Sequence, residues 1–341
     1  MNWCARRGIV RSERRFRFDG LHMTFYDIFN GDADGICALQ QLRLTAPCTA
    51  TLVTGAKRDT NLLKKVAPAA GDQLTVLDIS LHSNAASLSR ILDAGARVNY
   101  FDHHFAGEIP SHSNLQAHID TAPDVCTSLI VDRHLGGKHR AWAVVAAFGD
   151  NLRAAASAAA APLDLDAARL RQLRELGELI NYNAYGDTVA DLYFAPAELY
   201  RTLSGYADPF EFIAGEAVFA ALAQGYAADM AEALRMPPDL QTPACAVFVL
   251  PDAPWARRVS GSISNSLASA HPDRAHAVLS RRNDVFQVSV RAPNSKPQGA
   301  DVLCMEFETG GGRAGAAGIN RLPPSEYHRF LAAFERRYST S

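Results

Sequence analysis

Residues that could hold a divalent metal ion follow apolar runs at four points in the first 150 residues. They are Asp32, Asp34, Asp78, Asp102, His103, His104 and Asp150. A single aspartate after a strand is usually a turn former or a helix cap. Carboxylates that meet in one place, however, repel one another and raise one another's pKa unless a cation neutralises them. A shell of oxygens with one imidazole and no thiolate suits Mn²⁺ or Mg²⁺ better than structural zinc.

Parallel strands are the elements that could bring these residues together. Short β-rich or apolar runs cover residues 24–29, 74–79 and 97–101, and residues 36–44 have helical spacing. Strands separated by helical stretches indicate βαβ units and a parallel sheet. Ligands bind beyond the carboxyl ends of such strands, where the acidic residues stand. We therefore expect an α/β domain with a metal site at that edge of its sheet.

A glycine-rich segment near the C-terminus, residues 310–318 (G-G-G-R-A-G-A-A-G), could bind an anion. Consecutive glycines let backbone amides approach an anion closely. We expect a strand over residues 302–307 before the glycines, and a helix opening within residues 314–318 whose N-terminus would favour negative charge. Arg313 adds a side chain suited to phosphate. Arg291, at the end of an expected strand, is a second candidate, with an exposed structural arginine as the alternative interpretation.

Composition and pattern divide the chain into two α/β domains. The expected parts are residues 1–22, a disordered arm or misassigned start; 23–235, a metal-binding domain that is helical from residue 141; 236–243, a proline-containing linker; and 244–341, a smaller α/β domain. In the smaller domain we expect strands over 244–250, 275–280 and 285–290 and a helix over 257–269.

Charge and cysteine usage exclude several classes of protein. The formal net charge of the 341 residues is -2, which argues against binding long duplex DNA by bulk electrostatics. No apolar stretch reaches the roughly 18 residues of a membrane span. The six cysteines are scattered and form no C-x-x-C, so we expect neither a disulfide framework nor a zinc site. This pattern fits the reducing cytoplasm.

The order of the acidic motifs carries a resemblance to a known family. D-x-D-G at residues 32–35, a strand-end aspartate at 78, Asp-His-His at 102–104 and Gly-Asp at 149–150 resemble the four motifs of the DHH superfamily of phosphoesterases. Residues 310–318 resemble the glycine-rich signature of their DHH-associated C-terminal domain. The resemblance runs from about Met23 to the C-terminus. It implies a parallel-sheet N-terminal domain and a smaller α/β C-terminal domain, with the active site in the cleft between them.

The resemblance also implies a role for each matching residue. The implied ligands of one or two Mn²⁺ ions, with Mg²⁺ as an alternative, are Asp32, Asp34, Asp78, His103 and Asp150. Asp78 would bridge the ions where two are bound. Asp102 would fix the histidine tautomer, and His104 would face the substrate phosphate. The implied contacts to substrate phosphate are Arg291, Gly310, Gly311, Gly312 and Arg313.

Two positions depart from the pattern of the family. Ile28 stands where many members have a metal-binding histidine, so one of the two metal positions would have fewer protein ligands. Arg313 stands where many have histidine, which keeps a cation for the phosphate. Two further segments carry weaker signals. Residues 126–128 (C-T-S) could offer amides to a phosphate or simply cap a helix, and residues 181–186 (N-Y-N-A-Y-G) faintly resemble a substrate-side stretch of RecJ-type enzymes.

Within the superfamily, a chain with only the two core domains resembles the short-oligonucleotide phosphodiesterases, or nano-RNases, and the phosphoadenosine-phosphate phosphatases. We therefore expect a cytoplasmic phosphoesterase that hydrolyses short oligonucleotides or small nucleotides. A cyclic-dinucleotide phosphodiesterase and a RecJ-like single-strand exonuclease are alternatives within the family. A nucleotide-sensing module with weak catalysis is an alternative of another class. We expect no membrane partner and no long duplex DNA, and the oligomeric state stays open, with a homodimer among the alternatives.

Overall fold

The N-terminal domain is built on a parallel sheet. The computed structural model describes residues 23–339, so the interpretation of residues 1–22 as an arm lies outside the described part. Five strands, all parallel, lie in the order β2-β1-β3-β4-β5. Their bounds are β1 (Phe25–Phe29), β2 (Thr51–Val53), β3 (Gln73–Leu77), β4 (Arg97–Asp102) and β5 (Leu115–Ile119). The predicted α/β fold with a parallel sheet is confirmed.

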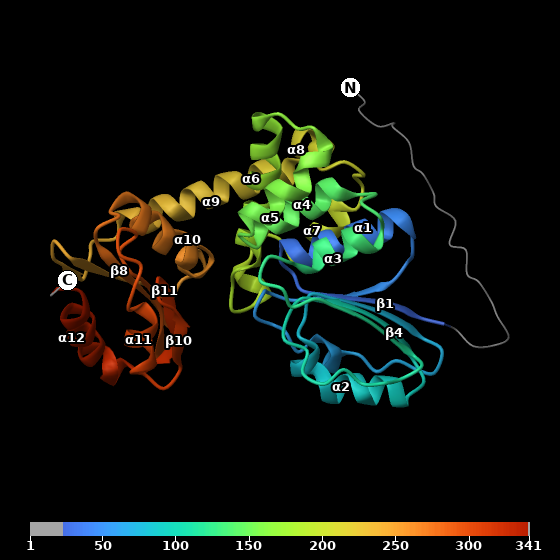
Figure 1. Cartoon of the computed structure of the whole chain (residues 1–341), viewed down its shortest axis with the longest axis horizontal. Coiled ribbons are helices and arrows are strands. Elements are labelled where there is room, and N and C mark those ends of the chain that lie inside the picture. Colours follow the sequence, from blue (N-terminus) through green and yellow to red (C-terminus); the bar gives the residue numbers. More distant parts are fainter. Residues whose placement is uncertain (1–22, 340–341) are drawn as a thin grey trace, which may run out of the picture.

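Apolar side chains on both faces of this sheet explain why helices cover both sides (Figure 1). On one face, Ile28, Val76 and Tyr100 pack against α2 (Leu81–Asp93). On the other, Phe29 and Phe101 pack against the helical part of the domain. This part contains α1 (Ala33–Thr45), α3 (Thr127–His134), α4 (Arg140–Gly149), α5 (Arg153–Ala160), α6 (Ala167–Ala184), α7 (Pro196–Leu203), α8 (Pro209–Gly215) and α9 (Ala217–Arg235). Short 3-10 turns are η1 (Leu62–Lys65), η2 (Ala161–Leu163) and η3 (Val189–Asp191).

The C-terminal domain has a mixed sheet in the order β10-β11-β9-β8-β7-β6. Only β7 and β8 pair in parallel among the described strands of this sheet. Its strands are β6 (Leu240–Gln241), β7 (Cys245–Leu250), β8 (Ala275–Arg282), β9 (Val285–Arg291), β10 (Gly310–Arg313) and β11 (Ala316–Leu322). Its helices are α10 (Pro254–Ala270), α11 (Ala300–Met305) and α12 (Tyr327–Tyr338), with a short turn η4 (Pro324–Glu326). Strand β6 lies inside the segment 236–243 for which the sequence predicts a linker.

Two expectations for the C-terminal domain were wrong. Residues 302–307 form helix α11 and the residue after its cap, not a strand, because Ala300, Leu303, Cys304 and Phe307 recur at helical spacing and are all buried. Residues 314–318 do not open a helix. They turn into strand β11, which pairs antiparallel with the glycine strand β10 and with β9.

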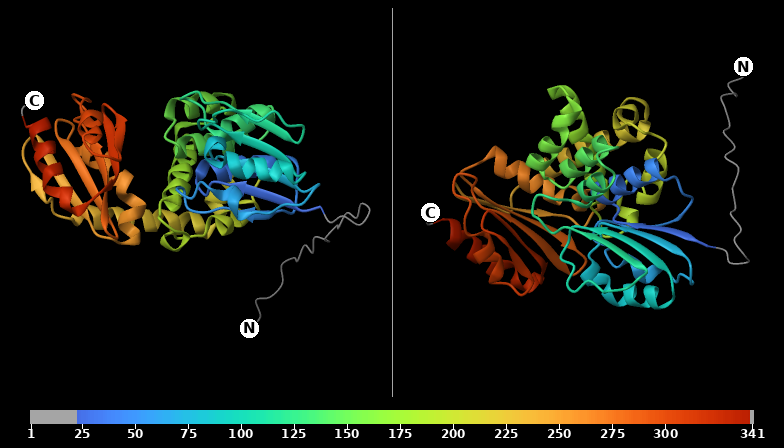
Figure 2. Two further views of the ribbon diagram at one scale, coloured as in Figure 1. Left: turned by 90° about the horizontal axis from the view of Figure 1, so that it is seen from below. Right: turned by 45° about the vertical axis from the view of Figure 1, so that its right-hand side comes forward.

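Helix α9 leads from one domain to the other, and the domains lie side by side along it (Figures 1 and 2). A shared apolar cluster joins α6 and α9 to α10, with Tyr182, Ala233 and Val259 among its members. Within this contact Arg258 of α10 is nearly buried and pairs with Asp229 of α9 at 2.7 Å. The C-terminal domain is therefore anchored to the helical part through apolar packing and ion pairs, which also include Arg257 with Asp191 at 2.6 Å.

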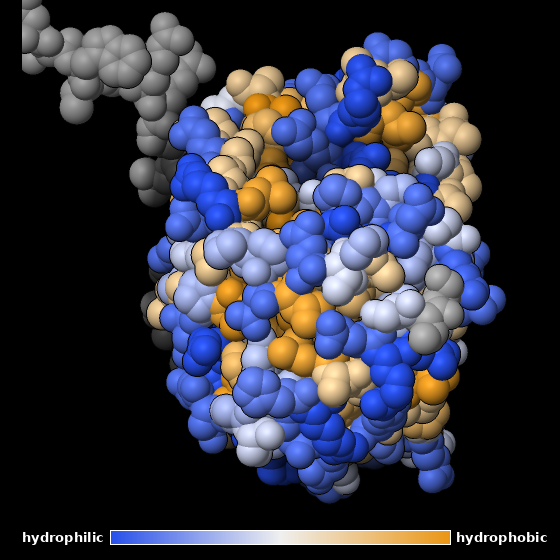
Figure 3. All heavy atoms as spheres, turned by 90° about the vertical axis from the view of Figure 1, so that its left-hand side faces the viewer, coloured by the Kyte–Doolittle hydropathy of each residue, from blue (hydrophilic) through white to orange (hydrophobic). Residues whose placement is uncertain are grey.

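Surface and helix composition add two observations. No helix within residues 23–339 is both long and apolar enough to cross a membrane. On the outer face of the C-terminal domain, hydrophobic side chains form small groups between hydrophilic ones (Figure 3). Two of the exposed hydrophobic residues of this domain, Val302 and Met305, belong to α11.

Candidate functional site

Asp32 and Asp34 stand at the start of α1, directly after β1. Asp32 is the N-cap of the helix, and its Oδ1 accepts hydrogen bonds from the backbone N–H of Asp34 and of Gly35, both at 3.1 Å. Its second oxygen, Oδ2, stays available for another contact. Both aspartates are buried, so the strand-to-helix turn holds two carboxylates where solvent does not screen them.

The carboxylate of Asp34 lies at the N-terminus of α3. It accepts hydrogen bonds from the backbone N–H of Thr127 and of Ser128, each at 2.7 Å. Unpaired amides at a helix N-terminus favour an anion, here a protein carboxylate. Asp34 thus occupies the amides that the sequence offers to a phosphate, and Cys126, the N-cap residue of α3, makes no side-chain capping hydrogen bond of its own.

Asp78 follows β3 in a backbone conformation that non-glycine residues seldom adopt, with φ at 59°. Its backbone N–H donates to the carbonyl of Phe101 on β4, and its Oδ1 accepts from the hydroxyl of Thr127 at 3.2 Å. Burial and then the charges of Asp32, Asp34 and Asp150 raise the pKa of Asp78 well above its usual value. A cation beside Asp78 would favour its ionised form.

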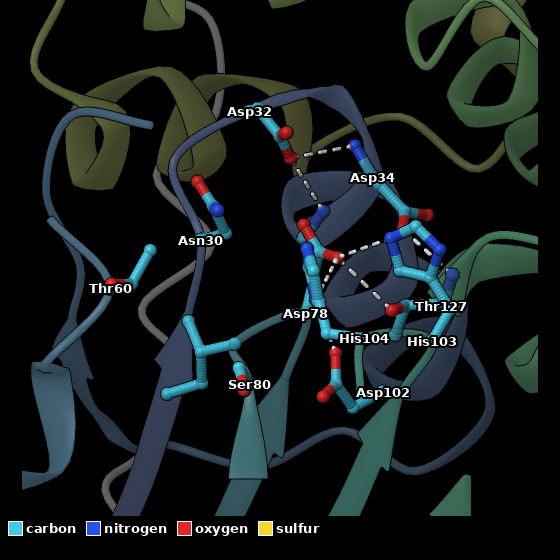
Figure 4. A network of polar contacts seen from close by, with 12 residues as sticks. Asn30, Asp32, Asp34, Thr60, Asp78, Ser80, Asp102, His103, His104 and Thr127 are labelled. Carbon is cyan, nitrogen blue, oxygen red and sulfur yellow. Dashed lines mark hydrogen bonds and ion pairs between the residues drawn. The ribbon is translucent and has the colours of Figure 1, made fainter. Parts of the chain in front are cut away.

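The Asp-His-His segment lies at the end of β4, and its two imidazoles have different neighbours (Figure 4). His103 points into the acidic cluster. Its Nε2 lies 3.4 Å from Asp78 Oδ1, 3.7 Å from Asp150 Oδ2 and 4.0 Å from Asp34 Oδ2. Asp102 is fully buried and contacts Nδ1 of His104 at 2.7 Å. Asp102 therefore orients His104, and this hydrogen bond raises the pKa of His104 above its ordinary value despite partial burial.

Asp150, the C-cap of α4, completes the cluster and meets a residue that the sequence did not single out. The ammonium of Lys57, from the loop after β2, lies 2.5 Å from Asp32 Oδ2 and 3.3 Å from Asp150 Oδ1. Burial alone would lower the pKa of Lys57, but Asp32 and Asp150 outweigh burial and raise it well above its usual value. Burial raises the pKa of Asp150 to about 6, and Lys57 opposes that rise.

The structure thus brings all five expected metal ligands to the carboxyl edge of the parallel sheet. Two sets of side chains offer ligand atoms within 4.8 Å of one another, Asp34 with His103 and Asp150, and Asp78 with His103 and His104. Their donors are carboxylate oxygens and imidazole nitrogens, which fit Mn²⁺ or Mg²⁺. Crowded and buried carboxylates with a raised pKa point the same way, because a divalent ion would relieve their repulsion.

A cleft of about 810 Å³ connects this cluster to the C-terminal domain. Lys57 and Asp150 line it from the first domain, and Asn265 and Arg291 line it from the second. Arg291 is held toward the cleft by Asn265, whose Oδ1 accepts from its Nε at 2.8 Å. Of the expected substrate contacts, Arg291 is thus the one that shares a cavity with the acidic cluster.

The glycines and Arg313 lie on β10, at the edge of the second sheet, and are absent from the lining of this cleft. Packing explains two of the three glycines. A Cβ on Gly310 would come within 1.7 Å of the carbonyl oxygen of Cys304. Gly312 has φ at 143°, and a Cβ on it would lie 2.5 Å from the Cα of Ala317. A Cβ on Gly311 would meet nothing within 4 Å. Arg313 is exposed, and its role stays a prediction.

Two functional contacts were missed by the sequence reasoning. Lys57 is one of five lysines in a chain whose basic residues are mostly arginine. The sequence around it does not indicate that it contacts Asp32, 25 residues earlier. The hydroxyl of Thr127 binds Asp78, whereas the sequence suggests it only for phosphate or for a cap. Asn181, in the segment with the faint RecJ-type resemblance, accepts from Lys57 at 3.1 Å.

Comparisons with known proteins identify the fold. No protein-family model and no curated protein sequence matches the chain significantly. Among solved structures, a DHH-domain protein described as a member of a family of ribosomal proteins superposes with a TM-score of 0.58 at 13% identity, over 92% of this chain and 86% of that one. Exonuclease RecJ bound to manganese gives 0.53 at 17% identity, over 92% and 89%. The pGpG-specific phosphodiesterase PggH from Vibrio cholerae gives 0.53 at 14% identity, over 93% and 99%.

Proposed function

Because the chain has the two-domain fold of DHH-domain proteins, we propose that it is a metal-dependent phosphoesterase that hydrolyses short oligonucleotides or small nucleotides. The observation that carries the proposal is the meeting of four aspartates and an imidazole from four separate segments at one edge of the sheet, open to a cleft between two domains. Buried carboxylates this close together raise one another's pKa unless a cation neutralises them.

The residues that would hold a divalent ion are Asp34, Asp78, His103 and Asp150, with Asp32 beside them. When bound, such an ion supplies Lewis-acid charge at a phosphoryl oxygen and lowers the pKa of a coordinated water. The manganese in the RecJ structure supports Mn²⁺ as the ion to test first.

The protein's own side chains contribute three further functions. His104, held by Asp102 through a hydrogen bond that favours its protonated form and raises its pKa, is the side chain placed to donate a proton to a phosphoryl or leaving-group oxygen. Arg291 binds phosphate from the opposite wall of the cleft as a fork of donors. The buried hydrogen bonds of Asp34 to the N-terminus of α3 fix one carboxylate before substrate arrives, which lowers the cost of organising the site.

A short substrate is the class that the cleft favours. The cleft connects the acidic cluster to Arg291 over a space suited to a small ligand. The structural match spans 99% of a phosphodiesterase described as specific for pGpG, a dinucleotide. The net charge of -2 gives no general attraction to a long polyanion.

A turnover screen tests the proposal. Purified protein would be incubated with Mn²⁺ and, separately, with dinucleotides, longer single strands, cyclic dinucleotides, phosphoadenosine phosphate and pyrophosphate. We expect hydrolysis of linear dinucleotides or phosphoadenosine phosphate, abolished by EDTA and restored by Mn²⁺. Nucleotide binding without turnover of any of these compounds would favour the sensing module, and turnover that survives EDTA would refute the metal-dependent mechanism.

A further inference from the structure

The ammonium of Lys57 lies in a shell of oxygens of the kind that surrounds a metal ion. It contacts Asp32 Oδ2 at 2.5 Å, Asn181 Oδ1 at 3.1 Å and Asp150 Oδ1 at 3.3 Å. An ammonium has three hydrogen-bond donors, so these three oxygens use all of them. The three acceptors come from three distant segments, which makes this position a built site for a cation.

A second cation position adjoins the first. It lies around His103 Nε2, between Asp78 Oδ1 and Asp150 Oδ2, with Asp34 Oδ2 at 4.0 Å. Asp150 connects the two positions, because its Oδ1 faces Lys57 and its Oδ2 faces His103. One position therefore holds a charged protein side chain, and the other offers only ligand atoms.

The loop that carries Lys57 is docked in place by backbone contacts. The N–H of Lys57 donates to the carbonyl of Ala184 at 3.0 Å, at the end of α6. On the other side, Gly31 and Gly55 approach so closely that a Cβ on Gly31 would lie 2.1 Å from the carbonyl oxygen of Gly55. The ammonium also lies 5.6 Å from the ring centre of Tyr185. Lys57 is thus positioned by the fold rather than by its side-chain contacts alone.

An ion in the first position would compete directly with the lysine. A divalent ion coordinates carboxylate oxygens at roughly 2.0 to 2.6 Å, and Asp32 Oδ2 already has the ammonium at 2.5 Å. A divalent ion and an ammonium this close would repel strongly, even at an effective dielectric constant of about 20. Ile28, four residues before Asp32, is fully buried among apolar side chains and offers no ligand atom to compensate.

We propose that Lys57 permanently occupies one of two adjacent cation positions, so that this protein works with one divalent ion and one ammonium. The inference rests on the proposed metal-dependent function and specifies its cofactor. Because Lys57 also lines the cleft, its charge faces the space in which substrate phosphate would lie. Lys57 is therefore a residue that positions charge in the site as well as a replacement for an ion.

Counting ions tests the inference without measuring activity. The full chain would be stripped with EDTA, titrated with Mn²⁺ and separated from free ions, and the bound Mn²⁺ would be counted by mass spectrometry. Electron paramagnetic resonance would then distinguish an isolated Mn²⁺ from an exchange-coupled pair. We expect one isolated ion in the wild type. In Lys57→Ala we expect two ions with a coupled spectrum, because the oxygens of Asp32, Asn181 and Asp150 become available.

Lys64→Ala, at an exposed lysine seven residues further on, is the matched control and should keep one isolated ion. If Lys57→Ala fails to fold, Lys57→Ser replaces it in the test, because its short polar side chain also leaves the three oxygens free for an ion. A coupled pair in the wild type would overturn the inference and leave the proposed function standing. One ion in the Lys57 variant would also overturn the inference, since the lysine would then not be what excludes the second ion. A wild type that binds no Mn²⁺ would overturn both.

Discussion

At the scale of single residues, Asp78 combines a positive φ with a buried carboxylate whose ionised form is unfavourable. Asparagine tolerates a positive φ at least as well as aspartate, so Asp78→Asn removes the charge without straining the turn. Burial and three neighbouring carboxylates already raise the pKa of Asp78. We expect the metal-free Asn variant to be more stable than the wild type by about 1 kcal/mol, and to lose Mn²⁺ binding and turnover.

Denaturant unfolding in EDTA and Mn²⁺ titration would measure the two effects of Asp78→Asn. Asp93→Asn, at an exposed aspartate at the end of α2, is the control and should change neither quantity. A destabilised metal-free Asp78→Asn protein would show that the charge is already compensated within the fold. Turnover at the wild-type rate would remove Asp78 from the metal site.

His276 gives the C-terminal domain a predicted dependence on pH. It is buried in β8, and burial, helped by Arg274 and His271, lowers its pKa to about 4. A histidine with a lowered pKa contributes stability that is fully present above the unfolded pKa of about 6.5. That stability is lost as the pH falls toward 4, because the unfolded chain then binds the extra proton. We expect this residue to account for on the order of 2 kcal/mol of acid destabilisation.

Unfolding free energies measured from pH 7.5 to pH 4.5 would check the prediction for His276. The slope against pH should be shallower in His276→Gln than in the wild type. His328→Gln changes an exposed histidine of the same domain and should keep the wild-type slope. Equal slopes in all three proteins would mean that His276 is accessible to protons in the folded domain.

At the scale of elements, the glycines of the β10–β11 hairpin differ in whether packing requires them. Gly310 and Gly312 have no room for a Cβ, and Gly312 also has φ at 143°. Gly312→Ala should therefore destabilise the domain by about 1 to 3 kcal/mol. Gly311→Ala should leave the melting temperature unchanged, because open space surrounds it. If the amide of Gly311 binds substrate phosphate closely, Gly311→Ala should raise KM while the melting temperature stays the same.

Thermal melts and steady-state kinetics on the two glycine variants would decide the role of the hairpin. If Gly311→Ala changes neither KM nor the melting temperature, substrate binding is not the reason for a glycine at position 311. The hairpin would then be a structural edge of the sheet.

Elements with a strong local pattern could be predicted, and those defined by partners could not. The strands β1, β3 and β4 are largely buried and read as apolar runs that lead into aspartates. Strands β2 and β5 lie at the sheet edges, are half exposed and carry no such signal. Helix α11 was mistaken for a strand because a short apolar run fits both periods. Lys57 was missed because nothing in the sequence around a loop lysine indicates which carboxylates the fold will place next to it.

At the scale of the whole molecule, the cleft that Asp150 and Arg291 line from the two domains predicts a preference for short substrates. Long single strands need an extended basic groove, and binding to such a groove weakens steeply with salt. The phosphate contacts proposed here are Arg291 and Lys57, on opposite walls of a small cleft. We therefore expect dinucleotides to tetranucleotides to be cleaved faster than strands of about twenty or more nucleotides, with weak dependence on salt.

A length series at low and at raised salt would measure this preference. Arg291→Ala should raise KM about tenfold to a hundredfold, as expected for loss of a charge-assisted contact, and Arg321→Ala, at an exposed arginine of the same sheet, should not. Faster and processive degradation of long strands would contradict the prediction and favour the RecJ-like alternative.

The order in which the chain is synthesised has a consequence for the oxygen shell around Lys57. Asp32 and Lys57 emerge early from the ribosome, Asp150 follows 93 residues after the lysine, and Asn181 follows 124 residues after it. At elongation rates of about 5 to 20 residues per second, Lys57 waits for about 5 to 25 seconds before these two partners have been synthesised. During that time Asp32 is the one acceptor of this shell that has already been synthesised, and the shell can be completed only once α6 has docked.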